Sequence, residues 1–241
     1  RDRGLWRACY THLLPELGPD THMVLNNLSA LAPLHLPQTA TTAPVVLQVL
    51  PEHSAAVQAL LQAQGWTNQP YILVHPGSRW LFKCWDDDKM AALLQGLLSD
   101  GHHIVLTAAP DAHEQAMIST LLNRISLPES GGRVYNLAGQ LNLMQLAAAI
   151  AAAKLFIGVD SVPMHMAAAL GTPGVALFGP SWLARWRPWS EHISVVYAGD
   201  YGPLPHPDSI DTANPTRLLS AIPLEAVQAA VALRLQQIQA S

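Results

Sequence analysis

The chain has 241 residues, half of them hydrophobic and 12% charged, a composition that excludes an intrinsically disordered protein. Its formal net charge of −4 gives no general attraction for nucleic acid, so we expect no nucleic-acid partner. No apolar run approaches the roughly 20 residues of a membrane span, so we also expect no transmembrane segment.

The N-terminal part of the chain has a broken hydrophobic pattern. The stretch HMVLNNLSALAPLHL (residues 22–36) predicts a helix that Pro33 ends. The Thr/Ala/Pro stretch at residues 37–44 has no period, and we place a domain boundary there. We therefore expect a remnant of another domain and a linker over residues 1–43, followed by the main domain over residues 44–241.

From residue 45 onward, short apolar runs alternate with segments of helical periodicity. The expected strands are residues 45–49, the YILVH run from Tyr71, and residues 103–107, 134–137, 155–159, 174–178 and 193–197. The expected helices are residues 52–64, 86–98, 111–125, 143–153, the segment between Ser161 and Gly171, and residues 224–239. Such repeated strand–helix units predict an α/β fold with a Rossmann-like, doubly wound parallel sheet.

The clearest of these units is LFIGVDSVPMHMAAALGTPGVALFG, residues 155–179. Ser161 is a candidate N-cap of its helix, and Gly171 is a typical helix stop. Ligands of parallel sheets bind beyond the carboxyl ends of the strands, where a helix N-terminus offers free N–H groups. That end of the unit carries Asp160, Ser161, Val162 and, one turn on, His165. We expect an anionic ligand there, a phosphate ester, although a helical histidine can also be a packing residue.

The loop HPGSRWLFK (residues 75–83) follows the strand that begins at Tyr71. Gly77 allows the backbone to approach a ligand closely, Ser78 offers a hydroxyl, and Lys83 can reach a phosphate as a point charge. The alternative is a surface turn with solvated cations. The position of the loop at a strand's carboxyl end favours binding.

Two acidic features allow more than one interpretation. Asp86, Asp87 and Asp88 begin a helix and complement its dipole, and no nearby residues complete a metal site, so we expect no metal. Glu114 lies in the first turn of the helix after the strand at residues 103–107. It can accept hydrogen bonds from a ribose diol or complement the dipole of its helix, and both interpretations stay open.

The loop PSWLARWRPW (residues 180–189) combines three tryptophans with two arginines. Sugars favour aromatic walls with arginine donors, so Arg185 and Arg187 are candidate sugar or acceptor contacts; packing of the loop on the sheet edge is an equal alternative. We interpret the histidines other than His165 as surface residues. The sequence has no GxGxxG after its first strand, no Walker loop and no serine elbow, which argues against a dehydrogenase, a P-loop enzyme and a hydrolase.

A family resemblance rests on five stretches: HPGSRWLFKCW, VLTAAPDAHEQ, NLAGQL, FIGVDSVPMHMAAALGTPGVALFG and WRPW. They resemble glycosyltransferase family 9, the ADP-heptose:lipopolysaccharide heptosyltransferases of Gram-negative bacteria. The FKCW and WRPW segments are most similar to the branch of that family that adds the third, side-branch heptose of the inner core.

This resemblance implies a GT-B fold, in which two Rossmann-like domains face each other across a cleft. The chain would supply the C-terminal donor-binding domain, and the N-terminal domain would be largely absent from it. The family needs no metal, so we expect no cofactor, only the donor substrate ADP-heptose. The acceptor would be the lipopolysaccharide inner core, and the protein would be cytoplasmic, with peripheral attachment to the inner face of the inner membrane left open. Cys9 and Cys84 lack a disulfide-framework spacing, which is typical of a reducing compartment.

The resemblance also implies roles for individual residues. The donor phosphates would be held by Ser78 and Lys83, the ribose by Glu114, and the adenine by the backbone around Leu141. The diphosphate and the sugar would be lined by Asp160, Ser161, Val162 and His165. Because its charge repels phosphate, Asp160 would fix its loop or accept a sugar hydroxyl.

The catalytic residue stays unknown, because the family's Gly-Asp motif, which carries the general base, begins the N-terminal domain, and we expect that region to be missing from this chain. We expect heptosyl transfer from a complete enzyme, and weak donor binding without turnover from this chain alone. Two alternatives stay open: a nucleotide-binding module without catalysis, and a GT-B enzyme that acts on another nucleotide sugar.

Overall fold

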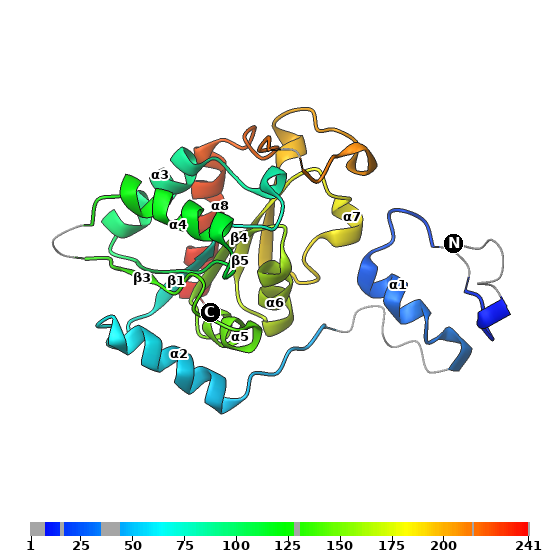
Figure 1. The fold of residues 1–241 in the computed structure, drawn as a ribbon, viewed down its shortest axis with the longest axis horizontal. Helices are drawn as coiled ribbons and strands as arrows, with labels where there is room; N and C mark the ends of the chain where they lie inside the picture. The colour runs from blue at the N-terminus through cyan, green and yellow to red at the C-terminus, as the bar shows by residue number, and fades with distance from the viewer. Residues whose placement is uncertain (1–7, 15–16, 35–43, 128–130, 214, 241) are drawn as a thin grey trace.

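The protein is described by a computed structural model that covers residues 8–14, 17–34, 44–127, 131–213 and 215–240. A six-stranded sheet lies at its centre (Figure 1). Its strands are β1 (Tyr71–His75), β2 (His103–Leu106), β3 (Val134–Asn136), β4 (Leu155–Val159), β5 (Gly174–Phe178) and β6 (Ile193–Tyr197). All neighbours are parallel, in the order β3-β2-β1-β4-β5-β6. The predicted doubly wound parallel sheet is confirmed.

Helices cover both faces of the sheet (Figure 1). One face carries α3 (Asp87–Ser99), α4 (Ala112–Arg124) and α8 (Leu224–Gln239), and the other carries α2 (Pro51–Ala63), α5 (Leu143–Ala151) and α6 (Val162–Leu170). Successive strand residues point to opposite faces, so β1 sends Ile72 and Val74 into one core and Tyr71 and Leu73 into the other. Because both faces of the sheet are buried, the strand sequences are unbroken apolar runs and do not alternate between apolar and polar residues.

Local sequence signals set several element boundaries. Asn142 caps α5 in a capping box with Gln145, because each side chain accepts from the other residue's backbone N–H. Gly171 ends α6 in the left-handed region, at φ 71°, where a side chain would be strained. The predicted strands from β1 to β6 and the helices α2, α3, α4, α5, α6 and α8 are confirmed within one or two residues at each end, whereas the short α7 (Leu183–Trp186) lies in a segment that was predicted to be a loop.

The predicted strand at residues 45–49 is wrong. This segment is extended but pairs with no strand, and Val46 is 75% exposed. Among the described residues, the Leu47 N–H donates to the Ala169 carbonyl, near the end of α6. β-Branched residues favour a pleated surface only where a sheet edge is available, and here the neighbour is a helix.

Among its described residues, the N-terminal part forms short elements (Figure 1). α1 spans Met23–Ser29, and a 3₁₀ turn spans Ala32–Leu34, so the helix predicted to end at Pro33 ends earlier, at Ser29. The predicted domain boundary at residues 37–44 lies, apart from Pro44, outside the described residues, and the division at residue 43 stays a prediction. In the described ranges, no helix is long and apolar enough to cross a bilayer.

Candidate functional site

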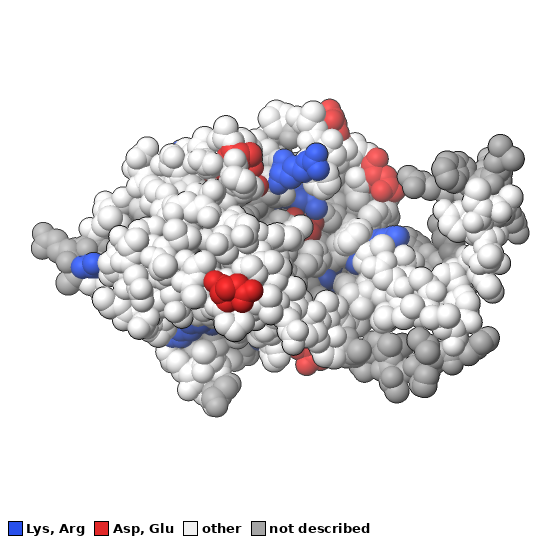
Figure 2. Space-filling view, turned by 60° about the horizontal axis from the view of Figure 1, so that its bottom comes forward, with Lys and Arg blue, Asp and Glu red and all other residues white. Residues whose placement is uncertain are grey.

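A cavity of about 930 Å³ opens at the carboxyl ends of the strands. Loops that follow β1, β2, β4 and β5 line it, together with the N-terminal ends of α4, α5 and α6. Figure 2 shows basic and acidic side chains meeting inside the hollow of this face. The cavity brings together eight of the residues predicted from the sequence: Ser78, Lys83, Glu114, Leu141, Asp160, Ser161, Val162 and His165.

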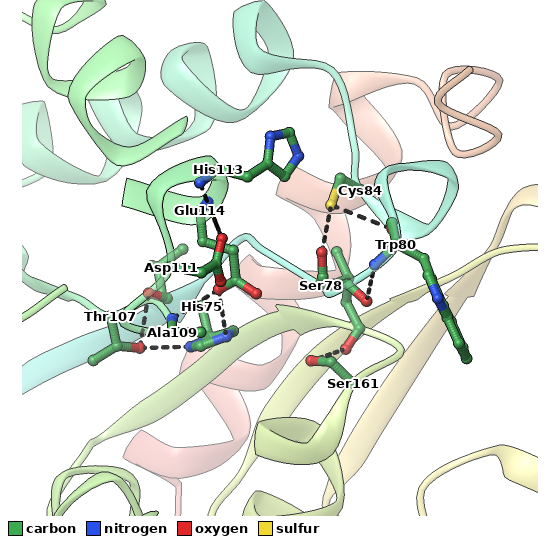
Figure 3. Close-up of polar contacts among 12 residues, drawn as sticks. His75, Ser78, Trp80, Cys84, Thr107, Ala109, Asp111, His113, Glu114 and Ser161 are labelled. Carbon is green, nitrogen blue, oxygen red and sulfur yellow. Dashed lines mark hydrogen bonds and ion pairs between the residues drawn. The ribbon is translucent and has the colours of Figure 1, made fainter. Parts of the chain in front are cut away.

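The buried thiol of Cys84 contacts the backbone of the loop after β1. Cys84 Sγ lies 4.0 Å from the Ser78 carbonyl and 3.8 Å from the Trp80 carbonyl, within reach of weak S–H hydrogen bonds (Figure 3). Burial raises the pKa of Cys84 to about 11, so it stays a thiol at neutral pH. Trp80 stacks against Phe82 with ring centroids 5.8 Å apart. These contacts fix the loop before any ligand binds.

Lys83 is not the free point charge that its motif suggested. Its Nζ lies 2.7 Å from Asp160 Oδ2, and the two side chains are only 14% and 6% exposed. The Ser181 hydroxyl also donates to Asp160 Oδ2. Asp160 therefore joins the loops after β1, β4 and β5, which is one of the two roles that the sequence left open for it.

The start of α6 faces the cavity without a side-chain cap. Ser161 occupies the N-cap position, as predicted, but its hydroxyl donates to the Val159 carbonyl instead of accepting from the helix. Within the first turn, Pro163 has no N–H and the Met164 N–H donates to the Ser161 carbonyl at 3.1 Å, so the Val162 N–H keeps its capacity for an external acceptor. Val162 is exposed at this end, and burial lowers the pKa of His165, so its imidazole is neutral near pH 7. This helix end can receive an anion.

Glu114 is buried at the edge of the cavity. Its Oε2 accepts from the Ala109 N–H at 2.8 Å and lies 3.6 Å from His75 Nε2 (Figure 3). Asp111 is the N-cap of α4 and accepts from the N–H groups of His113 and Glu114 itself. Because Asp111 already complements the helix start, the Glu114 carboxylate is turned away from its helix, toward the loop after β2 and the cavity.

Gly77 has a partner different from the one expected. A Cβ at this position would lie 2.7 Å from Glu114 Oε2, so the carboxylate, not a ligand, occupies the space that the glycine leaves. Burial raises the pKa of Glu114, which means that the site disfavours its charge unless a donor is close.

The interpretation of the remaining histidines as surface residues is wrong at two positions. His75 is 5% exposed, and its Nδ1 lies 3.0 Å from Thr107 Oγ1. His22 is 8% exposed, bonds to the Arg187 carbonyl at 2.8 Å and packs on Trp189. A signal for His75 was present, since it ends a fully buried strand, but nothing local pointed to the partner of His22.

The loop at residues 180–189 contributes two of its three tryptophans to the cavity, but not its arginines. Trp182 and Trp186 line the cavity, whereas Arg185 and Arg187 are not among its lining residues. Trp182 Nε1 donates to Asp208 Oδ1 at 3.2 Å, which brings the segment after β6 to the cavity wall. The sequence did not predict Asp208 or Ser181; the strand-end rule that selected Asp160 would also have selected Ser181, which closely follows β5.

The three aspartates at the start of α3 form ion pairs. Asp87 lies 2.6 Å from an Arg217 nitrogen, and Arg124 contacts both Asp87 and Asp88. Asp86 is the N-cap residue, and it pairs with Lys89. In the part of the chain that is described, no three potential metal ligands come together. The three aspartates therefore begin α3, and the Asp87–Arg217 pair connects this helix start to the C-terminal region.

Comparison with known proteins gives one matching family. The family model described as "Glycosyltransferase family 9 (heptosyltransferase)" matches residues 7–215. Lipopolysaccharide heptosyltransferase 3 of Escherichia coli (strain K12) is 36% identical over 230 residues, which cover 95% of this chain and 64% of that protein. Lipopolysaccharide heptosyltransferase 2 of Salmonella typhimurium is 37% identical over 117 residues, 48% of this chain and 32% of that protein. The chain thus spans less than two thirds of the length of these relatives.

Solved structures show the same fold. A glycosyl transferase family 9 protein from Veillonella parvula superposes with a TM-score of 0.73 at 22% identity, over 94% of this chain and 63% of that one. ADP-heptose lipopolysaccharide heptosyltransferase II of Escherichia coli gives a TM-score of 0.66 at 27% identity, over 86% of this chain and 57% of that one. The GT-B type of sheet predicted from the sequence is confirmed.

Proposed function

Since the chain belongs to glycosyltransferase family 9, we propose that it forms the donor-binding half of a heptosyltransferase that transfers heptose from ADP-heptose to the lipopolysaccharide inner core. The observation that carries this proposal is the meeting of Lys83, Asp160 and the N-terminus of α6 in one cavity. A cation beside the Val162 N–H at a helix N-terminus suits a diphosphate.

The proposed roles follow the chemistry of the transfer. The bond between the heptose and the diphosphate breaks, so negative charge grows on the leaving ADP. Lys83, the Val162 N–H and the positive end of the α6 dipole would stabilise that charge without a metal ion. Ser78 would add a hydroxyl donor, and Asp160 and His165 would face the sugar.

The nucleoside would extend along the cavity toward β2 and β3. Glu114 would accept from the ribose, and the backbone around Leu141, just before α5, would face the adenine. Both residues line the same cavity as Lys83, which supports a single extended ligand.

We assign no general base to this chain. The described carboxylates that line the cavity all have protein partners: Asp160 with Lys83, Glu114 with Ala109, and Asp208 with Trp182. We therefore propose that this chain alone binds the donor without turning it over. The acceptor would be a glycolipid reached at the inner face of the inner membrane.

Calorimetric titration of the chain with ADP and with UDP tests the donor class. ADP should bind more tightly, because the Leu141 region is proposed to face adenine. The variant Lys83→Ala should lose ADP affinity, while Lys154→Ala, a cation that does not line the cavity, should not. Equal or better binding of UDP would overturn the proposal of an ADP-sugar donor.

A further inference from the structure

The two oxygens of the Glu114 carboxylate are used differently. Oε2 accepts from the Ala109 N–H and faces His75 Nε2 and the Gly77 backbone. Oε1 makes no hydrogen bond to any described residue, and it is not among the fully buried unsatisfied atoms of the described chain. Since Glu114 lines the cavity, Oε1 is the oxygen that a ligand can reach. One half of the carboxylate is held by the protein, and the other is open to the cavity.

His75 is the part of this arrangement that the proposed function does not use. Its ring lies between Thr107 on β2's end and Glu114 on α4, and both ring nitrogens are engaged (Figure 3). The Thr107 hydroxyl lies closer to His75 Nδ1, at 3.0 Å, than to the Val74 carbonyl, at 3.5 Å.

These distances allow the proton of His75 to be assigned. We place it on Nε2, with Thr107 donating to Nδ1, because a bare Nε2 lone pair would repel the Glu114 carboxylate. In this tautomer the Nε2–H dipole points at Glu114 Oε2 across 3.6 Å, longer than a hydrogen bond, while the Ala109 N–H donates to the same oxygen at 2.8 Å. The hydrogen bond and the neighbouring N–H dipole together favour one orientation of the carboxylate about its Cγ–Cδ bond.

We propose that His75 is a positioning residue: it holds Glu114 Oε2 so that Oε1 points into the cavity and accepts from a ribose hydroxyl of the donor nucleotide. The inference rests on the proposed function and adds a residue to it. Without the His75 donor, the carboxylate can turn toward other N–H groups or withdraw, and recognition of the ribose hydroxyls weakens even though Glu114 is still present.

Two amide substitutions separate this role from a merely structural one. In His75→Gln, the side-chain NH₂ lies near the position of Nε2 and can still donate to Glu114. In His75→Asn, the shorter amide reaches the position of Nδ1, so it keeps Thr107 and loses Glu114. The two variants are matched in chemistry and differ in which contact survives.

The readout is the ratio of dissociation constants for 2′,3′-dideoxy-ADP and ADP, measured by calorimetry on the chain. A hydrogen bond to a charged acceptor makes this ratio about 10 to 150 in the wild type. His75→Gln should keep the ratio within about threefold of the wild type, and His75→Asn should reduce it by about tenfold. A loss of general packing would weaken both nucleotides equally and leave the ratio unchanged.

Each outcome has one meaning. A wild-type ratio near one would refute the ribose role of Glu114, and with it that part of the proposed function. The wild-type ratio can also fall in the expected range while His75→Asn, with a wild-type circular dichroism spectrum, shows the same ratio. That result would overturn the positioning role alone. If His75→Asn does not fold, Thr107→Val takes its place: losing the hydroxyl that orients the ring should also lower the ratio, and an unchanged ratio would refute the inference.

Discussion

Lys83 Nζ lies 2.7 Å from Asp160 Oδ2, and this pair crosses from the loop after β1 to the loop after β4. β1 and β4 are neighbours at the centre of the sheet, where the strand order changes direction and ligands of such folds bind. Lys83, which lines the cavity together with the start of α6, is therefore already paired with a carboxylate before an anion arrives. The pair has consequences for both stability and binding.

For stability, Lys83→Met should cost about 2 to 3 kcal/mol, because it leaves a buried carboxylate with Ser181 as its remaining side-chain donor. The double variant Lys83→Met/Asp160→Asn should cost less than the sum of the two single changes, by about 1 to 3 kcal/mol. Urea unfolding of the four proteins measures this coupling. Additive costs would show that the pair contributes nothing to the fold.

For binding, Lys83→Ala should weaken ADP about 10- to 150-fold, the range of one charge-assisted hydrogen bond. Asp160→Asn should leave ADP affinity equal or improved, because it removes a negative charge near the diphosphate, yet weaken an ADP-sugar donor. Parallel titrations of ADP and ADP-heptose measure the difference. A loss of ADP affinity in Asp160→Asn as large as that in Lys83→Ala would contradict this division of roles.

Gly77→Ala should disturb the site through Glu114. The new Cβ would lie 2.7 Å from Oε2, closer than atoms can approach, so the carboxylate must move. We expect a fall in stability of about 1 to 3 kcal/mol, as for other overpacked positions, together with weaker ADP binding. Gly96→Ala in α3 is the matched control, because its nearest contact is 3.9 Å away. Equal melting temperatures for the two variants would refute the close approach.

The stability of the protein should fall on acidification because of His75. Burial lowers the pKa of His75 to about 4 in the folded protein, below its ordinary value of 6.5, so the unfolded chain binds the proton first. The resulting loss of stability begins as the pH falls through about 6.5 and is of the order of 3 kcal/mol at pH 4.

The variant His75→Gln removes this titration and serves as the reference. The difference in unfolding free energy, wild type minus variant, should decrease as the pH falls from about 6.5 to about 4. It should stay constant above about pH 6.5. Glu114, whose pKa burial raises, acts in the opposite direction, favouring the fold at low pH, but it is present in both proteins and largely cancels. A flat difference across this range would show that the folded protein protonates His75 as readily as the unfolded chain does.

Chelation should leave ADP binding unchanged. The aspartates at the start of α3 are engaged with Arg217, Arg124 and Lys89, so we do not expect them to supply a metal for the donor. Titration of the chain with ADP in the presence and absence of EDTA checks this. A loss of affinity that magnesium or manganese restores would show that a metal takes part in donor binding.

The sequence was sufficient for the strands and for most of the cavity. Buried parallel strands are continuous apolar runs, and strand-end positions converge by topology, so Ser78, Asp160 and Ser161 could be placed without a structure. The 45–49 segment failed because the same apolar, β-branched pattern also suits extended chain along a helix.

Long-range partners could not be predicted in the same way. Lys83 and Asp160 are each recognisable in a local motif, but their mutual pairing depends on the order of strands in the sheet. The same holds for His75 with Glu114 and for Asp87 with Arg217, whose partners lie on different elements. A local pattern gives a residue's type and position along an element, and tertiary packing decides which group it meets.

The pairing of β1 with β4 also has a consequence for how the chain folds. Ile72 lies opposite Leu155, and the described residues between them form β2, β3, α3, α4 and α5 among other elements. During synthesis, the edge of β1 that pairs with β4 stays unpaired until β4 has left the ribosome. An exposed apolar edge of this kind can pair with other chains and aggregate. Nascent chains that stop before residue 155 should therefore depend on chaperones more than the full chain does, since they can neither protect that edge nor complete the cavity.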